Sequence, residues 1–488
     1  MRPDTLGFRR LSELLSRPVD SAILAYFRIA FGSVMLWEIL RYFAGNRIGT
    51  YWVQPKFHFS YFGFDWVRPL PGAGLYWLCG VLALASLAVI AGFRYRWSAA
   101  ILAVGFTYLF LIDQARYLNH GYLMCLLAWM SIMAPAHACC SIDALRRAGV
   151  RGNRVPAWWL WLLRFQVAVV YIYGGIAKLN TDWLRGEPMR AWLHERRDWP
   201  VLGGFFELHL APWFFCYSGL LFDLLIVPAL LWKRTRLAAF MVAILFHLTN
   251  SYLFNIGVFP WLAILLTALF FDPEWPRKIM RRTQSNDERA ILSPVTVIPP
   301  EIPSRHRDTR TPFDHGLSRR TFAALCIYSA VQILVPLRHF LYPGDVNWTE
   351  EGHRFSWHMM LRSKTVEAAS FYVINPHSGY AWLVDPLDYL TGRQFQKMVG
   401  HPDMIQQFCA HVGRVMREGG HPDSEVRAVV SLSLNDHPPA LLIDPNVNLA
   451  AVKRSLAPAT WILPLDPNRL NRQKPLRPFA RGLPEQTW

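Results

Sequence analysis

The sequence predicts an all-α polytopic membrane domain of about nine transmembrane helices, followed by a small α+β extracytoplasmic domain. Hydrophobic residues make up 53% of the 488 residues and charged residues only 17%, whereas soluble proteins carry about 25% charged residues. The formal net charge of +17 is spread over short basic clusters between apolar runs, so we expect no nucleic acid as a partner. Beyond residue 345 the apolar runs shorten, which indicates a separate domain.

Nine apolar segments come close to the ~20 residues that a helix needs to cross a bilayer. They lie at residues 22–43, 72–92, 97–113, 120–135, 157–178, 209–232, 237–253, 256–272 and 321–338. Segment 120–135 is short, and segments 237–253 and 256–272 almost touch. A buried or re-entrant segment therefore remains an alternative to a full crossing for one of these.

Basic loops indicate the orientation of the predicted bundle, because Lys and Arg favour cytoplasmic loops. With the basic N-terminus inside, the short loops on the same side hold Arg94, Arg96, Arg146, Arg147, Arg151, Arg154, Lys233, Arg234 and Arg236. The expected organisation is a cytoplasmic N-terminus (1–21), a bundle with the functional site (22–272), a cytoplasmic basic linker (273–320), a last helix (321–338) and an extracytoplasmic domain (339–488).

The tail and the linker show different patterns. Residues 402–418 have one apolar face, with Pro402 before it and Gly419 after it, which predicts a helix. Alternation in residues 429–434 predicts a strand. The tract 282–316 is rich in Pro, Ser, Thr and Arg, and we expect a flexible linker there.

Ionisable residues inside a membrane span are costly, which makes them candidates for function. In the segment 157–178, Tyr171, Gly174, Gly175 and Lys178 are spaced i, i+3, i+4 and i+7, so they share one helix face. The glycines leave room for a flat ligand or for a close helix. An apolar environment favours a neutral lysine, which can act as a base. The alternative is a lysine that reaches the lipid headgroups.

Other polar residues point to the same outer side. His120 begins segment 120–135, where it is either an interfacial or a functional histidine. His247, Asn250 and Ser251 form a polar stripe on segment 237–253. Hydrogen bonding between helices is the alternative role for this stripe.

A second set of charged residues lies deeper in the membrane. At 1.5 Å per residue, Arg164 and Asp223 lie about 10–14 Å from the inner edge, and Arg28 lies at a similar depth. We predict an Arg164–Asp223 ion pair, which Arg28 can share. A structural role is the main interpretation of this pair.

Five stretches carry a resemblance to a known family. They read LNHGYLMCLLAWMS (118–131), LLRFQVAVVYIYGGIAKLNTDWLRGEP (162–188), GLLFDLLIVPALLWKRTR (219–236), FHLTNSYLFNIGVFPW (246–261) and RFSWHMMLRSK (354–364). In these residues and in their order, the chain resembles the vitamin K-dependent γ-glutamyl carboxylases, including their bacterial relatives.

The resemblance implies a reaction and a site. The family deprotonates vitamin K hydroquinone, which reacts with oxygen to give a strong base that removes a γ-proton from glutamate. Carbon dioxide then adds to the carbanion, and vitamin K 2,3-epoxide is the coupled product. The resemblance assigns the base to Lys178, in GGIAKLN, and the carbanion and carbon dioxide stage to His120, in LNHGYL. From their helix faces, and not from the resemblance, we expect the quinol to be bound by Tyr171, Gly174, Gly175, Gln166, His247 and Asn250.

The expected cofactor is vitamin K hydroquinone or menaquinol, with oxygen and carbon dioxide as co-substrates. Seven scattered cysteines form no CxxC pair, so we expect no metal. The expected partners are a glutamate-containing peptide or protein and the lipid bilayer, and the expected location is a bacterial inner membrane with the active site facing outwards. The alternatives are a quinol epoxidase or quinone-binding protein without carboxylase activity, and a transporter or membrane scaffold.

Overall fold

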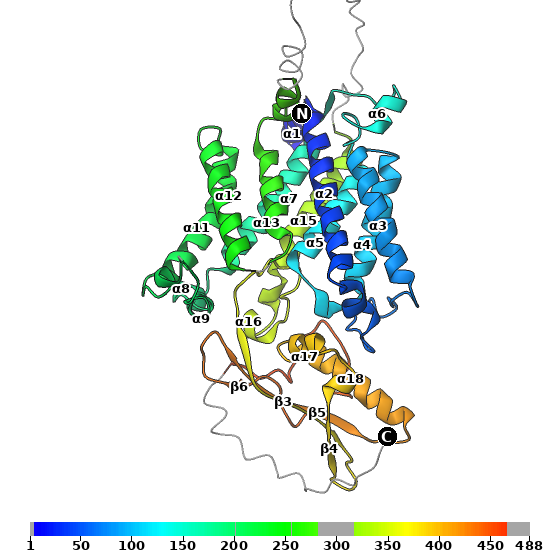
Figure 1. Cartoon of the computed structure of the whole chain (residues 1–488), viewed down its shortest axis with the longest axis vertical. Helices are drawn as coiled ribbons and strands as arrows, with labels where there is room; N and C mark the ends of the chain where they lie inside the picture. Colours follow the sequence, from blue (N-terminus) through cyan, green and yellow to red (C-terminus); the bar gives the residue numbers. More distant parts are fainter. Residues whose placement is uncertain (1–3, 201, 255, 282–316, 466–488) are drawn as a thin grey trace, which may run out of the picture.

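The computed structural model describes residues 4–200, 202–254, 256–281 and 317–465 (Figure 1). Its fold confirms the predicted class, because a bundle of apolar helices is followed by a domain that contains a four-stranded sheet. The N-terminus and the C-terminal domain lie at opposite ends of the bundle. The predicted flexible tract 282–316 lies outside the described residues.

All nine predicted segments are helical, and seven of the described helices are long and apolar enough to cross a membrane. These seven are α2 (Ala22–Ala44), α3 (Gly74–Ala91), α4 (Tyr95–Ile112), α7 (Trp158–Ala177), α11 (Ala211–Leu231), α12 (Arg236–Leu253) and α15 (Arg319–Leu337). At 1.5 Å per residue, such helices match the roughly 30 Å apolar core of a bilayer.

The other two predicted crossings are shorter helices. α5 (Asn119–Met133) has 15 residues, and α13 (Phe259–Thr267) has 9 and continues as the 3-10 turn η3 (Ala268–Phe270). A 15-residue helix spans only about 22 Å. Among the described residues, seven helices rather than nine therefore have the length of a full crossing.

Short helices and strands connect these elements. They are α1 (Asp4–Ser16), β1 (Pro18–Asp20), η1 (Gly49–Val53), η2 (Gln114–Arg116), α6 (Ile142–Arg146), β2 (Arg154–Pro156), α8 (Thr181–Leu184), α9 (Met189–His194), α10 (Gly203–Phe206), η4 (Arg338–Leu341) and α16 (Val346–Thr349). β1 and β2 pair antiparallel, with Val19 opposite Val155. This pairing joins the beginning of α2 to the beginning of α7.

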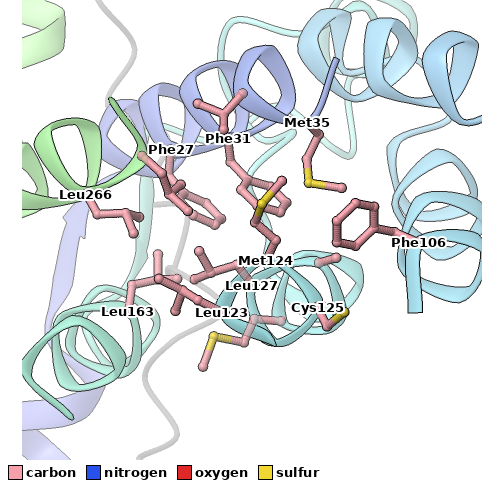
Figure 2. Packing of buried hydrophobic residues seen from close by; sticks show 14 of the residues in the cluster. Phe27, Phe31, Met35, Phe106, Leu123, Met124, Cys125, Leu127, Leu163 and Leu266 are labelled. Carbon is pink, nitrogen blue, oxygen red and sulfur yellow. The ribbon is translucent and has the colours of Figure 1, made fainter. Parts of the chain in front are cut away.

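The apolar core of the bundle gathers around α5 (Figure 2). Side chains of α2, α4, α7 and α13 lie around those of α5 in this view, including Phe31, Phe106, Leu163 and Leu266. Leu127 of α5 is fully buried. Because lipid tails are as apolar as leucine, close packing holds such helices together. This packing fixes α5 in its place, and with it His120 in its first turn.

The C-terminal domain is an antiparallel sheet covered by one helix. Its elements are β3 (Lys364–Ile374), β4 (Ala381–Val384), η5 (Pro386–Asp388), α17 (Gly392–Met398), α18 (Pro402–Glu418), β5 (Glu425–Leu434) and β6 (Ala440–Leu441). The strand order is β4-β3-β5-β6, and Phe371 lies opposite Ala428. Burial alternates along β5, and Phe408 of α18 packs against Phe371. The predicted helix and strand are thus confirmed.

Hydrogen bonds join this domain to the loop before α5. Gln394 donates through Nε2 to Oδ2 of Asp113 at 2.8 Å, and Gln407 donates through Nε2 to Oε1 of Gln114 at 3.0 Å. All four side chains are buried. A buried polar group that loses its partner costs about 1–3 kcal/mol, so these contacts fix the domain on this end of the bundle.

Candidate active site

Lys178 lies at the C-terminal end of α7 and points back along the helix. Its Nζ donates to Oδ2 of Asp223 at 2.6 Å and to the carbonyl of Gly174 at 3.1 Å. The Trp183 ring centroid lies 5.4 Å from Nζ. Lys178 is only 6% exposed and Asp223 only 5%. The lysine is therefore held inside the protein, and the alternative of a side chain that reaches the headgroups does not describe it.

The two glycines of α7 allow α11 to approach. A Cβ atom on Gly175 would lie 2.6 Å from Cδ2 of Leu224, and one on Gly174 would lie 3.1 Å from Oδ2 of Asp223. Real Cβ contacts are rarely this short, so a larger residue would push α11 away. Of the two uses predicted for these glycines, the structure shows the close helix, which brings Asp223 onto Lys178.

The predicted Arg164–Asp223 ion pair is wrong. Arg164 donates to the carbonyls of Leu269 at 2.9 Å and Phe271 at 3.0 Å, where carbonyls at a helix end lack helical partners. Arg28 donates to the carbonyl of Cys140. Asp223 lies near the middle of α11 and pairs with Lys178. Helical side chains tilt toward the N-terminus of their own helix, so Lys178 reaches Asp223 from the C-terminal end of α7.

His120 is positioned by hydrogen bonds to the loop of the RFSWH stretch. Asn119 donates through Nδ2 to the carbonyl of His358 at 3.0 Å, and Tyr117 donates to Oδ1 of Asn119 at 2.9 Å. The backbone N–H of Phe355 in turn donates to the hydroxyl of Tyr117. Two stretches that carry the resemblance, separated by over 200 residues, are thus held together.

The loop that contains the RFSWH stretch has an unusual backbone. Phe355, Trp357 and Met360 have φ angles of 63°, 59° and 56°, in the left-handed region that side chains with a Cβ rarely adopt. Such a conformation costs about 1–3 kcal/mol per residue and persists only where the surroundings fix it. Trp357 is 1% exposed, so its packing supplies part of this restraint.

A cavity of about 530 Å³ lies between the bundle and the C-terminal domain. Lys178, His120, Asp223 and Asn250 all line it. Its apolar wall consists of Trp183, Met189, Trp192, Phe246, Phe254 and Phe259. Residues of the C-terminal domain, including His358 and Arg362, form the opposite wall. The two predicted catalytic residues therefore share one site, together with Asn250.

Five of the six predicted quinol-binding residues do not line this cavity, and they are Tyr171, Gly174, Gly175, Gln166 and His247. The two glycines pack against α11 instead. Tyr171 of α7 and His247 of α12 bond to each other, with 2.7 Å between the hydroxyl and Nε2. Gln166 accepts a hydrogen bond from Tyr328 of α15. All of these contacts join two helices, which is the alternative role foreseen for the polar stripe.

The C-terminal wall rests on a buried carboxylate. Glu350 is 6% exposed and forms ion pairs with Arg362 at 2.6 Å and with Lys364 at 2.8 Å. Burial alone would raise the pKa of Glu350, but the charges of Arg362 and Lys364 hold it well below its usual value. The role of Arg362 was not evident from its place in RFSWHMMLRSK, and the structure shows that Glu350 fixes it beside the cavity.

Among the described residues, no group of three or more His, Cys, Asp or Glu side chains could hold a metal ion. The expectation that the site works without a metal stays a prediction.

Residues 16–275 match the family described as "HTTM domain", and residues 317–468 match "Vitamin K-dependent gamma-carboxylase, lumenal domain". The chain belongs to the vitamin K-dependent gamma-carboxylase family. Lys178 and His120 fall in the first match and Arg362 in the second, so the cavity lies between the two matched parts. No solved structure matches the chain.

Family membership gives the function in coarse terms. It implies a vitamin K-dependent carboxylase-type enzyme, and the apolar helices support a multi-pass membrane protein. The coupling to epoxidation and the roles of single residues depend on the chemistry of the site.

Proposed function

We propose that this protein carboxylates the γ-carbon of glutamate in a peptide and couples this step to the epoxidation of vitamin K hydroquinone by oxygen. The supporting observation is one cavity on which both Lys178, buried against Asp223, and His120 open, beside an aromatic wall. Deprotonation of a quinol needs a positioned base, and a carbanion needs a site from which water is excluded. Lys178 supports the first requirement and the aromatic wall the second.

The cavity fits a quinol with a fused aromatic ring. Its volume of about 530 Å³ lies within the ~300–1,000 Å³ typical of small-molecule sites. Trp183, Phe246 and Phe259 offer flat apolar surfaces to the ring. Lys178 and Asn250 would contact its hydroxyl groups. Menaquinol carries the same ring system, so it would use the same contacts.

Lys178 is the proposed acceptor of the quinol proton. Asp223, at 2.6 Å, can take a proton from the ammonium group, which leaves a free amine because a low-dielectric site disfavours two separate charges. The amine then accepts the hydroxyl proton, and the resulting ammonium stabilises the quinol anion. The bound hydroquinone, through its reaction with oxygen, supplies the strong base that removes the γ-proton.

His120 is proposed to act on the glutamate side chain. Its ring stacks on Phe259, with 6.1 Å between the ring centroids, and it lines the same cavity as Lys178. A positioned imidazole N–H can donate to the oxygen on which charge develops as the carbanion forms and adds carbon dioxide. The aromatic wall keeps out water that would protonate the carbanion.

The test supplies purified protein with reduced vitamin K or menaquinol, oxygen, labelled bicarbonate and a glutamate-containing peptide. We expect both epoxide and fixed label. Lys178→Ala should abolish both products, and an added amine should partly restore the epoxide. The matched control is Lys278→Ala, because Lys278 is exposed and, among the described residues, its one ion pair is with Glu274 at 3.6 Å. Full epoxidation by Lys178→Ala would remove Lys178 as the base.

His120→Ala should lower carboxylation more than epoxidation, while His377→Ala, which changes an exposed histidine, should lower neither. An equal loss of both products in His120→Ala would instead place His120 in quinol binding. Epoxide without fixed label in the wild-type protein would support a quinol epoxidase. The absence of both products would favour a quinone-binding protein, a transporter or a scaffold.

A further inference from the structure

The cavity is lined by more cationic side chains than have an acidic partner. Eight Lys and Arg side chains line it. Four of these have an acidic partner within 4 Å, in the pairs Arg41–Glu38, Lys178–Asp223, Arg354–Asp403 and Arg362–Glu350. The other four have no such partner among the described residues, and they are Arg47, Arg116, Arg393 and Lys397.

Arg116 and Arg393 stand together over one aromatic ring. The guanidinium carbons lie 3.4 Å and 5.0 Å from the ring centroid of Tyr51, and Arg393 donates to the Tyr51 hydroxyl at 3.2 Å. Nε of Arg116 is buried and, in the described part of the chain, has no hydrogen-bond partner. Burial and the charge of Arg393 both lower the pKa of Arg116. Two like charges therefore line the same cavity.

Lys397 adds a third charge from α17, one turn after Arg393. It lines the cavity, and no hydrogen bond or ion pair of its Nζ is found within the described residues. Burial, followed by the charge of Arg362, lowers the pKa of Lys397 to about 8. A bound anion would offset the cost of burying these three cations together.

We propose that Arg116, Arg393 and Lys397 form a carboxylate-binding subsite for an acidic residue that neighbours the target glutamate in a peptide substrate. The inference rests on the proposed function. Arg354 and Arg362 already pair with Asp403 and Glu350, so a second carboxylate would be held by the unpaired cations. Arginine forks match planar carboxylates. The three residues thus select peptides with clustered acidic residues.

The test measures the binding of short fluorescent peptides to the full chain in lipid nanodiscs, without hydroquinone. One peptide has a central Glu flanked by Glu, and the other has a central Glu flanked by Gln. We expect the acidic peptide to bind about 10-fold more tightly, as one charge-assisted hydrogen bond allows. Arg393→Gln/Lys397→Gln should remove this preference and leave the binding of the Gln-flanked peptide unchanged.

The matched control is Arg414→Gln/Lys453→Gln, which removes two exposed charges outside the cavity and should keep the preference. Lys397→Arg keeps the charge and should also retain it, which separates a lost subsite from a misfolded protein. Equal affinity for both peptides in the wild-type protein overturns the proposal. An unchanged preference in the Gln double variant also overturns it.

Adding sodium bicarbonate tests whether the subsite binds a small anion instead of a peptide carboxylate. Loss of the preference at millimolar bicarbonate would assign the subsite to a small anion and overturn the peptide assignment. Retained preference supports the assignment. The readout needs no turnover, so a protein that binds without forming product would contradict the proposed function and leave this subsite standing.

Discussion

Lys178 and Asp223 are both buried and lie 2.6 Å apart. A charge on either side chain would therefore be costly without the other. Removing one partner of a buried pair typically costs about 3–5 kcal/mol, whereas removing both can be nearly neutral. We therefore expect Lys178→Met and Asp223→Leu each to lower thermal stability strongly, and the double variant to recover most of it. Thermal unfolding of the detergent-solubilised protein measures this. The recovered double variant should form no epoxide, which separates lost chemistry from lost folding.

The control pair for this cycle is Arg164→Met with Asp223→Leu. Arg164 binds carbonyls of Leu269 and Phe271, so its effect should add to that of Asp223→Leu without coupling. Coupling between Arg164 and Asp223, in place of Lys178 and Asp223, would contradict the observed pair.

A substitution of Tyr171 distinguishes a structural role of this residue from a role in quinol binding. Its hydroxyl bonds His247 at 2.7 Å away from the cavity lining, and such bonds between membrane helices contribute about 0.6 kcal/mol on average. Tyr171→Phe should lower thermal stability slightly and leave the KM for quinol unchanged. A KM raised tenfold or more would return Tyr171 to the quinol site.

Lys397 should make peptide binding depend on pH. Its pKa is lowered to about 8, against about 10.4 for an unperturbed lysine, so the free site loses this charge as pH rises through about 8. The charged and titratable groups around it are Glu350, His353, Arg354, Arg362, Lys364 and His401. Affinity for the acidic peptide should fall above pH 8, whereas in Lys397→Arg it should stay level. Equal pH profiles for both proteins would count against Lys397.

Single candidate residues of the site could be predicted from the sequence, but the residues that pair with them could not. Lys178 and His120 could be predicted because a rare charge or imidazole in an apolar segment is visible locally, and because their motifs resemble a family. Asp223 was singled out too, but it was given the wrong partner. Depth counted along each helix does not say which helices are neighbours, and the pair depends on the contact that Gly174 and Gly175 permit.

At the level of elements, the contact of α7 with α11 controls the site. In Gly175→Ala the new Cβ would lie 2.6 Å from Cδ2 of Leu224, and such overpacking costs typically about 1–3 kcal/mol. We expect lower thermal stability together with slower epoxidation, because α11 carries Asp223. Leu224→Ala in the same chain should restore part of both losses.

Gly80→Ala is the matched control for this substitution. Gly80 also lies inside a membrane helix, α3, but a Cβ there would have no atom within 4 Å. Alanine favours a helix over glycine by about 0.5–1 kcal/mol, so stability should stay level or rise. A loss as large as that of Gly175→Ala would show a general intolerance of helix glycines rather than a close contact.

The elements themselves were largely predictable, since a long apolar run predicts a membrane helix from local composition alone. The exceptions have physical reasons. α5 and α13 are too short to cross, and α5 packs at the core of the bundle instead (Figure 2). The short length of residues 120–135 left a buried segment as an alternative, but the sequence does not show that α2, α4, α7 and α13 surround it.

At the level of the whole molecule, the cavity exists only because two matched parts of the chain meet. Its cationic wall combines Arg116, from the loop before α5, with Arg393 and Lys397 of α17. These positions lie almost 300 residues apart, and their sequence pattern shows only isolated basic residues. Docking of the C-terminal domain through Gln394 and Gln407 is what brings them together.

The arrangement of the whole chain predicts its orientation in the membrane. The basic loops near Arg94, Arg146 and Lys233 lie at the end of the bundle opposite the C-terminal domain (Figure 1), and loops of this kind stay in the cytoplasm. The loop 179–208 at the other end of the bundle is also basic. Part of its positive charge is balanced, however, because Arg190 pairs with Glu187 at 2.7 Å.

Cysteine labelling of spheroplasts tests this orientation. Cys140 is exposed at the basic end, and Ser378 is exposed in the turn between β3 and β4. With the other cysteines replaced by serine, an impermeant maleimide should label a Ser378→Cys variant that lacks Cys140. It should label a variant that keeps only Cys140 after the membrane is opened, and not before. The reverse pattern would place the active site in the cytoplasm, where a peptide substrate would meet the cavity before export rather than after it.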